Sequence, residues 1–364
     1  MSVASISPKG ELMLGVLTPL LGRMVPTGAF SLPGDINNDA RVLVIDSGDL
    51  TELLFFSPIL KHLKERYPGM RFTFLVREGN SELVRAMPQI SEMISYEPSH
   101  LSLSSTTFLK LVNRVRVRHF NVTFLLGSEF NFARSVLALA TGAKIRIGFT
   151  SARTFPFINC EVKASSDGIY EGARVEAFLT ALAMNPHNGL PAWSLPEHDL
   201  NWAKQQVHFH KPQKDVKLIV VDPGVGKGNH RIAESTFRYL VDQLALEMNM
   251  KVLVLSNNLD RKRLAAFRSN LDADVLSLEP NNAKEGLALL SRADLFLAGN
   301  TDFFHYGVKM KIPTIGLFTR HDTSNWLPKG SPWVQIVQGV KGEKVSLDEF
   351  KSKIDTLLHL TRVV

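Results

Sequence analysis

Residues 41–58 read Arg41-Val-Leu-Val-Ile-Asp-Ser-Gly-Asp-Leu-Thr-Glu-Leu-Leu-Phe-Phe-Ser-Pro58. This segment indicates the fold class of the 364-residue chain. Residues 42–45 form a short apolar run rich in β-branched side chains, which is typical of a buried parallel strand. Residues 47–49 supply turn chemistry, and apolar side chains then recur with helical spacing. A strand, a polar turn and a helix in this order predict a doubly wound α/β domain. Such domains bind ligands at the carboxyl ends of their strands, so Asp49 and Glu52 are the first carboxylates to consider.

The composition bounds the size and class of the protein. With 45% hydrophobic and 21% charged residues, the chain is long enough for two domains with sizeable cores. A formal net charge of +7 and a pI near 9.4 favour anionic partners without choosing among phosphates, acidic lipids and nucleic acid. The single cysteine, Cys160, excludes an internal disulfide and is interpreted as a small buried hydrophobe. Arg114, Arg116, Arg118 and His119 end a predicted helix and are interpreted as a solvated face that complements the helix dipole.

The apolar segment 11–30 lacks the pattern of a membrane span or a signal peptide. Pro19 and Pro26 interrupt it, and no apolar run in the chain reaches the ~18 residues that cross a bilayer. A basic start and a small-residue cleavage site are also missing. We expect the segment to pack on the first domain or to make an oligomer contact. The alternative is an interfacial helix that lies on a membrane, since Arg23 and a basic protein accompany it.

Strand and helix patterns alternate along most of the chain, which predicts parallel sheets covered by helices on both faces. Strands are expected at 42–45, 71–76, 92–96, 121–126, 144–148, 217–222, 251–256, 274–278, 294–298 and 314–318. Besides the helix that follows the opening strand, helices are expected at 81–87, 106–118, 131–141, 170–184, 234–247, 259–270, 283–291 and 303–310. A capping box from Ser346 to Glu349 opens a last helix that extends to about residue 360.

The alternation breaks at residues 150–200, where prolines accompany a single predicted helix, so this region is interpreted as the connection between two lobes. The predicted organisation is an N-terminal extension (1–40), an N-terminal Rossmann-like lobe (41–195), a C-terminal Rossmann-like lobe (196–345) and a C-terminal helix (346–364). The two lobes are expected to face each other across a cleft.

A glycine-rich basic loop in the second lobe follows one strand and precedes a helix. In residues 222–231, Gly224 and the neighbouring glycines let the backbone approach a ligand closely, and Lys227, His230 and Arg231 supply cationic hydrogen-bond donors. This combination suits a diphosphate. The loop has neither the Lys-Ser/Thr ending of a Walker loop nor the acidic partner of a dinucleotide-binding fingerprint.

A second polar loop, residues 299–305, also follows a strand and opens a helix. Asn300, Thr301, Asp302 and His305 place amide, hydroxyl, carboxylate and imidazole groups at a helix amino terminus, which is a ready anion site. Thr301 or Asp302 is expected to cap the helix. The alternative is that Asp302 only caps and that His305 packs against Tyr306.

At these residues the chain resembles the heptosyltransferase family, glycosyltransferase family nine, over most of residues 41–340. The family's first strand leads into Arg-x-Asp-x-x-Gly-Asp, five further residues and a proline. Counting back from Pro58 without gaps places its Gly-Asp pair on Thr51 and Glu52. Residues 222–231 are similar to the family's His-Pro-Gly-Ala-Ser loop and following Lys-x-Trp, with His230 in place of the lysine. Residues 300–305 are similar to its Asn-Asp-Ser-Gly-Pro-x-His loop, one residue shorter and without its glycine.

The resemblance implies a GT-B architecture, with the acceptor on the first lobe and the nucleotide-sugar donor on the second. It also implies an inverting glycosyltransferase that requires no metal or cofactor. It would move a sugar, heptose or a related one, from a nucleotide-sugar donor such as ADP-heptose to a lipopolysaccharide or other surface-glycan acceptor. Glu52 would be the base that takes the acceptor's proton, with Asp49 as its alternative. The residues implied to bind the sugar donor are Gly224, Lys227, His230, Arg231, Asn257, Asn300, Thr301, Asp302 and His305.

The same resemblance implies where the protein works and with what. The expected acceptor is lipid-linked, and the expected location is the cytoplasm with peripheral contact to the inner face of the cytoplasmic membrane. Nucleic acid is not an expected partner, because the chain has no recognisable nucleic-acid module or aromatic stacking platform. An alternative hypothesis follows from Thr51-Glu52 standing where the family has Gly-Asp. The chain would then be a catalytically degenerate member that binds a nucleotide or glycan, or serves as a scaffold.

Overall fold

The computed structural model describes residues 29–127, 129–151, 154–163, 170–184, 195–211, 215–224, 232–255, 261–276, 278–319, 326–328, 330–339 and 345–363. The chain divides into two compact units, unit 1 (Met1–Pro191) and unit 2 (Ala192–Val364), each of which is described by itself. Within the ranges just given, no helix is long and apolar enough to cross a membrane. Most of the apolar segment 11–30 lies outside the described residues, so its packing stays a prediction.

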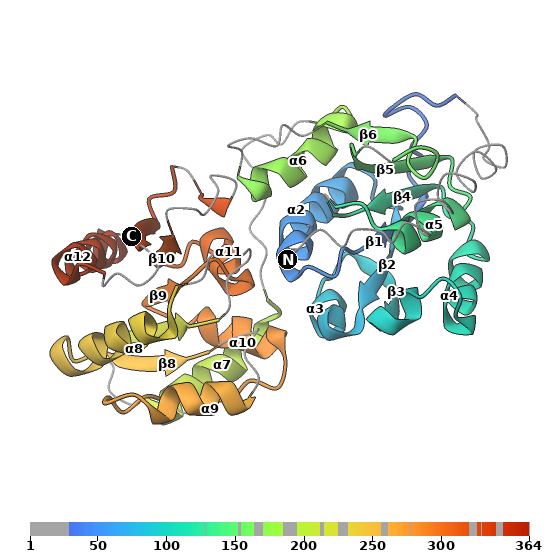
Figure 1. Cartoon of the computed structure of the whole chain (residues 1–364). Helices are drawn as coiled ribbons and strands as arrows, with labels where there is room; N and C mark the ends of the chain where they lie inside the picture. Colours follow the sequence, from blue (N-terminus) through green and yellow to red (C-terminus); the bar gives the residue numbers. More distant parts are fainter. Residues whose placement is uncertain are drawn as a thin grey trace. The chain divides into compact units, whose positions relative to one another are not determined.

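Unit 1 is built on a six-stranded parallel sheet with the order β3-β2-β1-β4-β5-β6 (Figure 1). Its strands are β1 (Arg41–Ile45), β2 (Arg71–Arg77), β3 (Ile90–Tyr96), β4 (Val122–Leu125), β5 (Ile145–Phe149) and β6 (Cys160–Val162). From β1 the chain runs to one edge through β2 and β3, and it then continues on the other side of β1 with β4. The switch of direction therefore lies between β1 and β4, which is where doubly wound sheets bind their ligands.

Helices cover both faces of this sheet: α2 (Leu50–Arg66), α3 (Ser81–Arg85), α4 (Thr106–Arg116), α5 (Phe132–Ala140) and α6 (Glu171–Ala181). On one face, α4 and α5 pack with Leu43 and Ile45 in one apolar cluster. On the other, Phe56 of α2, Phe124 of β4 and Phe178 of α6 stack edge to face, with ring centroids 5.3, 5.7 and 5.7 Å apart. Because successive strand side chains point to opposite faces, the buried run of β1 serves both cores.

Helix α2 contains the second half of the segment 41–58 and continues through Pro58. A proline lacks the N–H that would donate to the carbonyl four residues earlier, here that of Leu54. The Ser57 hydroxyl donates to the Leu54 carbonyl instead, at 3.0 Å. The helix therefore continues to Arg66 and buries an apolar face along its length.

Unit 2 is built on a five-stranded parallel sheet with the order β11-β10-β9-β7-β8 (Figure 1). Its strands are β7 (Leu218–Asp222), β8 (Lys251–Val254), β9 (Leu295–Ala298), β10 (Thr314–Thr319) and β11 (Val334–Gly339). One apolar cluster joins the sheet to α8 (Glu234–Asp242) with its π-helical continuation Gln243–Glu247, α9 (Arg261–Ser269) and α12 (Leu347–Val363). The remaining helices are α7 (Glu197–His210), α10 (Ala283–Leu290) and α11 (Asp302–Lys309). The direction of winding changes between β7 and β9.

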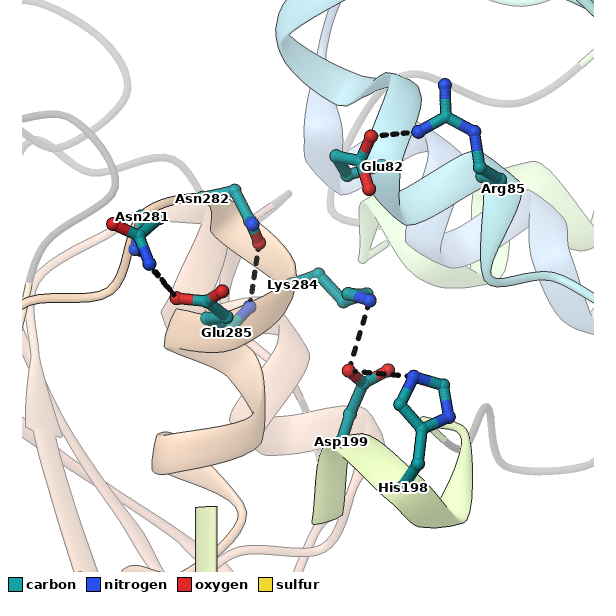
Figure 2. A network of polar contacts seen from close by, with 8 residues as sticks. All are labelled: Glu82, Arg85, His198, Asp199, Asn281, Asn282, Lys284 and Glu285. Carbon is teal, nitrogen blue, oxygen red and sulfur yellow. Dashed lines mark hydrogen bonds and ion pairs between the residues drawn. The ribbon is translucent and has the colours of Figure 1, made fainter. Parts of the chain in front are cut away.

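An ion pair fastens α7 to α10 in unit 2 (Figure 2). Lys284 Nζ lies 3.0 Å from Asp199 Oδ1, and the two side chains are only 17% and 9% exposed. His198 Nε2 lies 3.2 Å from the same carboxylate oxygen. Asn282 caps α10 by accepting the Glu285 N–H at 2.9 Å. A carboxylate this deeply buried depends on its cationic partner, so the pair ties the position of α7 to that of α10.

The predicted alternation of strands and helices is confirmed for most elements, and the differences have local causes. Helix α7 is not predicted, because its polar sequence, with histidines at both ends, gives no continuous apolar stripe. The predicted strand 274–278 is not formed over its described residues, where Leu276 makes one bridge, to Leu253, while residue 277 lies outside the described part of the chain. Strands β6 and β11 are also not predicted. Both lie at the edge of a sheet.

Candidate active site

The turn after β1 is organised around a buried carboxylate that the sequence pattern does not single out. Asp46 Oδ1 accepts the Gly48 N–H at 2.7 Å and the Tyr96 hydroxyl at 3.1 Å, and Oδ2 accepts the Arg77 N–H at 3.2 Å. Burial raises the pKa of Asp46 above its ordinary value, although these hydrogen bonds act in the opposite direction. The contacts fix the turn to β2 and β3 and thereby fix where α2 begins.

Asp49 and Glu52, the two carboxylates predicted for catalysis, occupy different positions at the start of α2. Asp49 is the N-cap, and its Oδ1 accepts the Thr51 N–H at 2.8 Å, so it satisfies a backbone group of the helix. Glu52 lies half-buried in the first helical turn. The exposed N–H groups and the dipole at a helix amino terminus favour a negative charge at that position.

Gly127, just after β4, brings three side chains around one point. Its φ of +101° lies in the left-handed region. A Cβ at this position would stand 3.1 Å from Ser47 Cβ, 3.5 Å from Arg134 Nη1 and 3.8 Å from Glu52 Oε2. The missing side chain therefore leaves room for the Glu52 carboxylate and the Arg134 guanidinium to approach the same place. Because β1 and β4 are neighbours, that place is the switch point of the sheet.

Arg134 of α5 supplies a positive charge at this site. Asn131 caps α5 by accepting the Arg134 N–H at 3.1 Å, and Arg134 Nη1 donates to the Asp46 carbonyl oxygen at 3.2 Å. The guanidinium of this nearly buried arginine is thus anchored to the turn after β1. Beside it lies a small, open hollow whose polar lining includes Glu129, Asn131, Arg134, Ser135, Ser151 and Thr154. A hollow with these groups suits the polar part of a ligand.

In unit 2 the two loops predicted to hold the sugar donor begin side by side. β7 and β9 are neighbours, with Asp222 paired to Ala298, so the residues that follow them leave the sheet at one edge. Asp222 is fully buried, and its Oδ1 accepts the Gly224 N–H at 2.8 Å, which closes a turn directly after β7. Gly224 lies at this edge. Four further predicted residues lie outside the described part of the chain: Lys227, His230, Arg231 and Asn257.

The start of α11 presents the remaining predicted residues. Thr301 is the N-cap and accepts the Phe304 N–H at 3.2 Å, while the nearly buried Asp302 is the first helical residue. His305 is fully buried, and its Nε2 lies 2.8 Å from Asn300 Oδ1. The Nδ2 group of Asn300 is buried and has no hydrogen-bond acceptor among the residues that the structure describes. His305 thus fixes the orientation of the Asn300 amide at a helix amino terminus.

The structure brings the predicted residues together in two groups. Asp49 and Glu52 lie at the switch point of the first sheet, and Gly224 lies with Asn300, Thr301 and Asp302 at that of the second. His305 packs on Phe304 and Trp326, at ring distances of 5.1 and 5.2 Å. Sequence reasoning missed three residues of the first group: Asp46, Gly127 and Arg134. Asp46 and Gly127 follow adjacent strands, which is the signal that indicates them.

Comparison with known proteins identifies the family. The family model of glycosyltransferase family 9 (heptosyltransferase) matches residues 108–353, about two thirds of the chain. The chain belongs to glycosyltransferase family 9. It is accordingly a glycosyltransferase, and the predicted fold class, two Rossmann-like lobes of GT-B architecture, is confirmed. The match begins after the opening motif, so the role of Glu52 depends on the spacing back from Pro58.

Relatives and solved structures of this family resemble the chain at low identity. The lipopolysaccharide core heptosyltransferase OpsX of Haemophilus influenzae is 22% identical over 282 residues, 74% of this chain and 76% of OpsX. A family 9 glycosyltransferase from Veillonella parvula has a TM-score of 0.74 at 15% identity, covering 92% of this chain and 100% of the other. The Escherichia coli heptosyltransferase WaaC with ADP-2-deoxy-2-fluoro heptose has a TM-score of 0.66 at 13% identity, covering 86% and 99%. These two structural matches show the fold.

Proposed function

We propose that this glycosyltransferase inverts configuration as it moves a heptose or related sugar from a nucleotide-sugar donor to a lipopolysaccharide or other surface-glycan acceptor. The observation that carries the proposal is the position of Glu52 in the first turn of α2, beside Gly127 and Arg134. Support comes from relatives whose names state lipopolysaccharide core heptosyl transfer and a bound ADP-heptose analogue. ADP-heptose is therefore the first sugar donor to test.

In the proposed reaction Glu52 is the general base. Its carboxylate takes the proton of an acceptor hydroxyl as that oxygen attacks the anomeric carbon, and the bond from that carbon to the diphosphate oxygen breaks. The nucleoside diphosphate leaves with the electron pair. Glu52 is favoured over Asp49 because the Asp49 carboxylate already accepts a backbone N–H of α2. A glutamate at the family's aspartate position adds one methylene to the reach of the base.

The sugar donor is assigned to the switch point of the second sheet. The amide of Asn300, oriented by His305, and the amino terminus of α11 offer hydrogen-bond donors to a diphosphate. Gly224 allows close approach of the backbone, and Lys227, His230 and Arg231 are proposed to balance the charge of the leaving group. Asn257 is proposed to contact the nucleotide. His305 is proposed to act through Asn300, because its Nε2 already contacts Asn300 Oδ1.

The acceptor is assigned to the hollow of unit 1 around Arg134. Asn131, Ser135 and Ser151 offer polar groups there, and the guanidinium suits an acidic sugar or a phosphate of a glycan core. A lipid-linked acceptor places the enzyme in the cytoplasm, in peripheral contact with the inner face of the cytoplasmic membrane. No metal or cofactor enters the proposed reaction.

A screen of ADP-, UDP- and GDP-sugars tests this proposal. The cognate sugar donor should raise the melting temperature, because a ligand that binds only the folded protein stabilises it. It should also release nucleoside diphosphate when lipopolysaccharide core fragments are added. A donor that shifts melting without transfer would favour the second candidate, a degenerate nucleotide-binding member, which Thr51-Glu52 in place of Gly-Asp motivates. If no sugar donor raises the melting temperature and none is consumed, both the transferase function and the nucleotide-binding function are contradicted.

A further inference from the structure

The outward side of α4 exposes apolar side chains that the fold leaves uncovered. Leu109 and Val117 are 63% and 56% exposed, and Leu103, in the turn before the helix, is 37% exposed. The opposite side of α4 packs into the core of unit 1 through Phe108, Leu111 and Val115. Exposed apolar residues are ordinary when scattered, but here they gather on one helix together with cations. The α4 face consists of Leu103, Leu109, Lys110, Arg114, Arg116 and Val117.

The helical spacing places the cations around the apolar residues. Leu109 and Val117 lie eight residues apart, about two turns, and therefore on the same side of the helix. Lys110 and Arg114 lie toward one edge of that side, and Arg116 lies toward the other. Figure 1 shows α4 as a surface helix beside α5 in unit 1. Long cationic side chains at the edges of an apolar strip can reach outward while the strip enters an apolar phase.

The α4 face is positively charged because acidic residues are missing around it. The sequence has no aspartate or glutamate from Pro98 to Ser128. Of the nearby carboxylates, Glu92 pairs with Arg118, and Glu97 precedes the 3-10 turn that contacts α4. Among the described residues, Lys110 and Arg116 make no ion pair. These cations are therefore free to interact with an external anionic surface.

We propose that the α4 face docks the protein on an anionic lipid surface. The cations contact acidic headgroups, each contributing about fivefold to the binding constant, and Leu109 and Val117 enter the headgroup boundary. The choice of a bilayer over another polyanion rests on the proposed lipid-linked acceptor and on the apolar residues between the cations. A dissolved polyanion offers no apolar phase to cover them.

Vesicle co-sedimentation of the full chain, without a sugar donor, tests the proposal. The wild type should bind phosphatidylglycerol-containing vesicles and be released by salt, and it should bind pure phosphatidylcholine vesicles weakly. Lys110→Gln/Arg116→Gln should weaken binding roughly 25-fold, from about fivefold for each cation. The matched control is Lys204→Gln/Lys262→Gln, which makes the same charge change at exposed positions of α7 and α9.

The apolar contribution is tested in the same way with Leu109→Ser against Leu246→Ser, since these leucines are 63% and 62% exposed. Only Leu109→Ser should weaken vesicle binding, while both variants keep the wild-type circular dichroism and melting curve. Equal losses in the control variants, or unchanged binding in the α4 variants, would overturn the proposal. The proposal would also be overturned if the protein forms a dimer that Leu109→Ser dissociates, or if single-stranded DNA binds the α4 face and vesicles do not. Failure here leaves the proposed sugar transfer untouched, since soluble core fragments report on transfer separately.

Discussion

Gly127 has a left-handed backbone conformation and lies beside Glu52, the proposed catalytic base. Its φ of +101° disfavours any residue with a Cβ, and the added atom would crowd Ser47 beside Glu52 and Arg134. Gly127→Ala should lower the unfolding free energy by about 1–2 kcal/mol and reduce turnover by tenfold or more, because small displacements at a reacting centre are costly. Urea denaturation and steady-state kinetics measure the two effects.

Gly142 provides the matched control for this substitution. It also has a positive φ, +66°, but an added Cβ would meet no atom within 4 Å. Gly142→Ala should therefore show a backbone cost of about 1 kcal/mol and normal turnover. Equal turnover in the two variants would show that the space beside Glu52 has no role.

His305 is predicted to act by holding Asn300. His305→Ala removes the 2.8 Å contact to Asn300 Oδ1 and should raise the Kd of the sugar donor about tenfold, with a smaller change in kcat. His305→Gln, which keeps a hydrogen-bond donor, should restore part of the affinity. Isothermal titration calorimetry gives the Kd. Thr123→Val, which breaks a buried hydrogen bond to Thr141 in unit 1, is the control that lowers stability only. A Kd unchanged by His305→Ala would contradict the positioning role.

At the scale of elements, the packing of α7 on α10 depends on the ion pair of Lys284 with Asp199. Lys284→Ala leaves the Asp199 carboxylate with His198 but without its lysine partner, in a site that is only 9% exposed. It should lower the unfolding free energy by about 2–3 kcal/mol. Arg85→Ala breaks the exposed pair with Glu82 in α3, also drawn in Figure 2, and should cost well under 1 kcal/mol. Similar costs in urea denaturation would mean that burial of the pair adds nothing.

Elements with regular apolar periodicity could be predicted from sequence, and elements held by distant partners could not. Strand β1 and helix α2 follow from local pattern and turn chemistry. Helix α7 is polar along most of its length and is fastened by Lys284, far away in the sequence, so no local pattern indicates it. The predicted strand 274–278 has suitable residues, but its pairing is limited to a single bridge from Leu276. Strand length depends on the neighbour as well as on the residues.

The candidate sites follow the same rule. The places of Asp49, Glu52, Asn300 and Thr301 at helix starts could be predicted, because each follows closely on an apolar run, while their roles stay predictions. The surroundings of Glu52 could not, since Tyr96 reaches Asp46 across 50 residues and Arg134 reaches its carbonyl across 88. Such contacts depend on strand order. Sequence periodicity indicates that strands exist, and only the fold brings β1 beside β4.

In the whole molecule, the two units share the same arrangement of strands and turn at the switch point of the sheet. Each is a parallel sheet whose winding changes direction next to its first strand, β1 in unit 1 and β7 in unit 2. At each switch point the carboxylate of a buried aspartate, Asp46 or Asp222, accepts a backbone N–H and so closes a short turn. Polar residues follow each of these turns. Unit 1 presents a carboxylate there, and unit 2 presents hydrogen-bond donors. This division of chemistry is what a base-assisted transfer from an anionic sugar donor requires.

The proposal that Glu52 is the base of sugar transfer is tested by comparing the turnover of Glu52→Gln with that of Asp49→Asn. Glutamine keeps the size of the side chain without the proton-accepting charge, so kcat should fall by on the order of 10²–10⁴-fold while the Kd of the sugar donor stays unchanged. Asparagine keeps the capping oxygen of Asp49, so Asp49→Asn should retain most of the turnover. Near-normal turnover of Glu52→Gln, together with a large loss in Asp49→Asn, would contradict the claim and move the base to the helix cap.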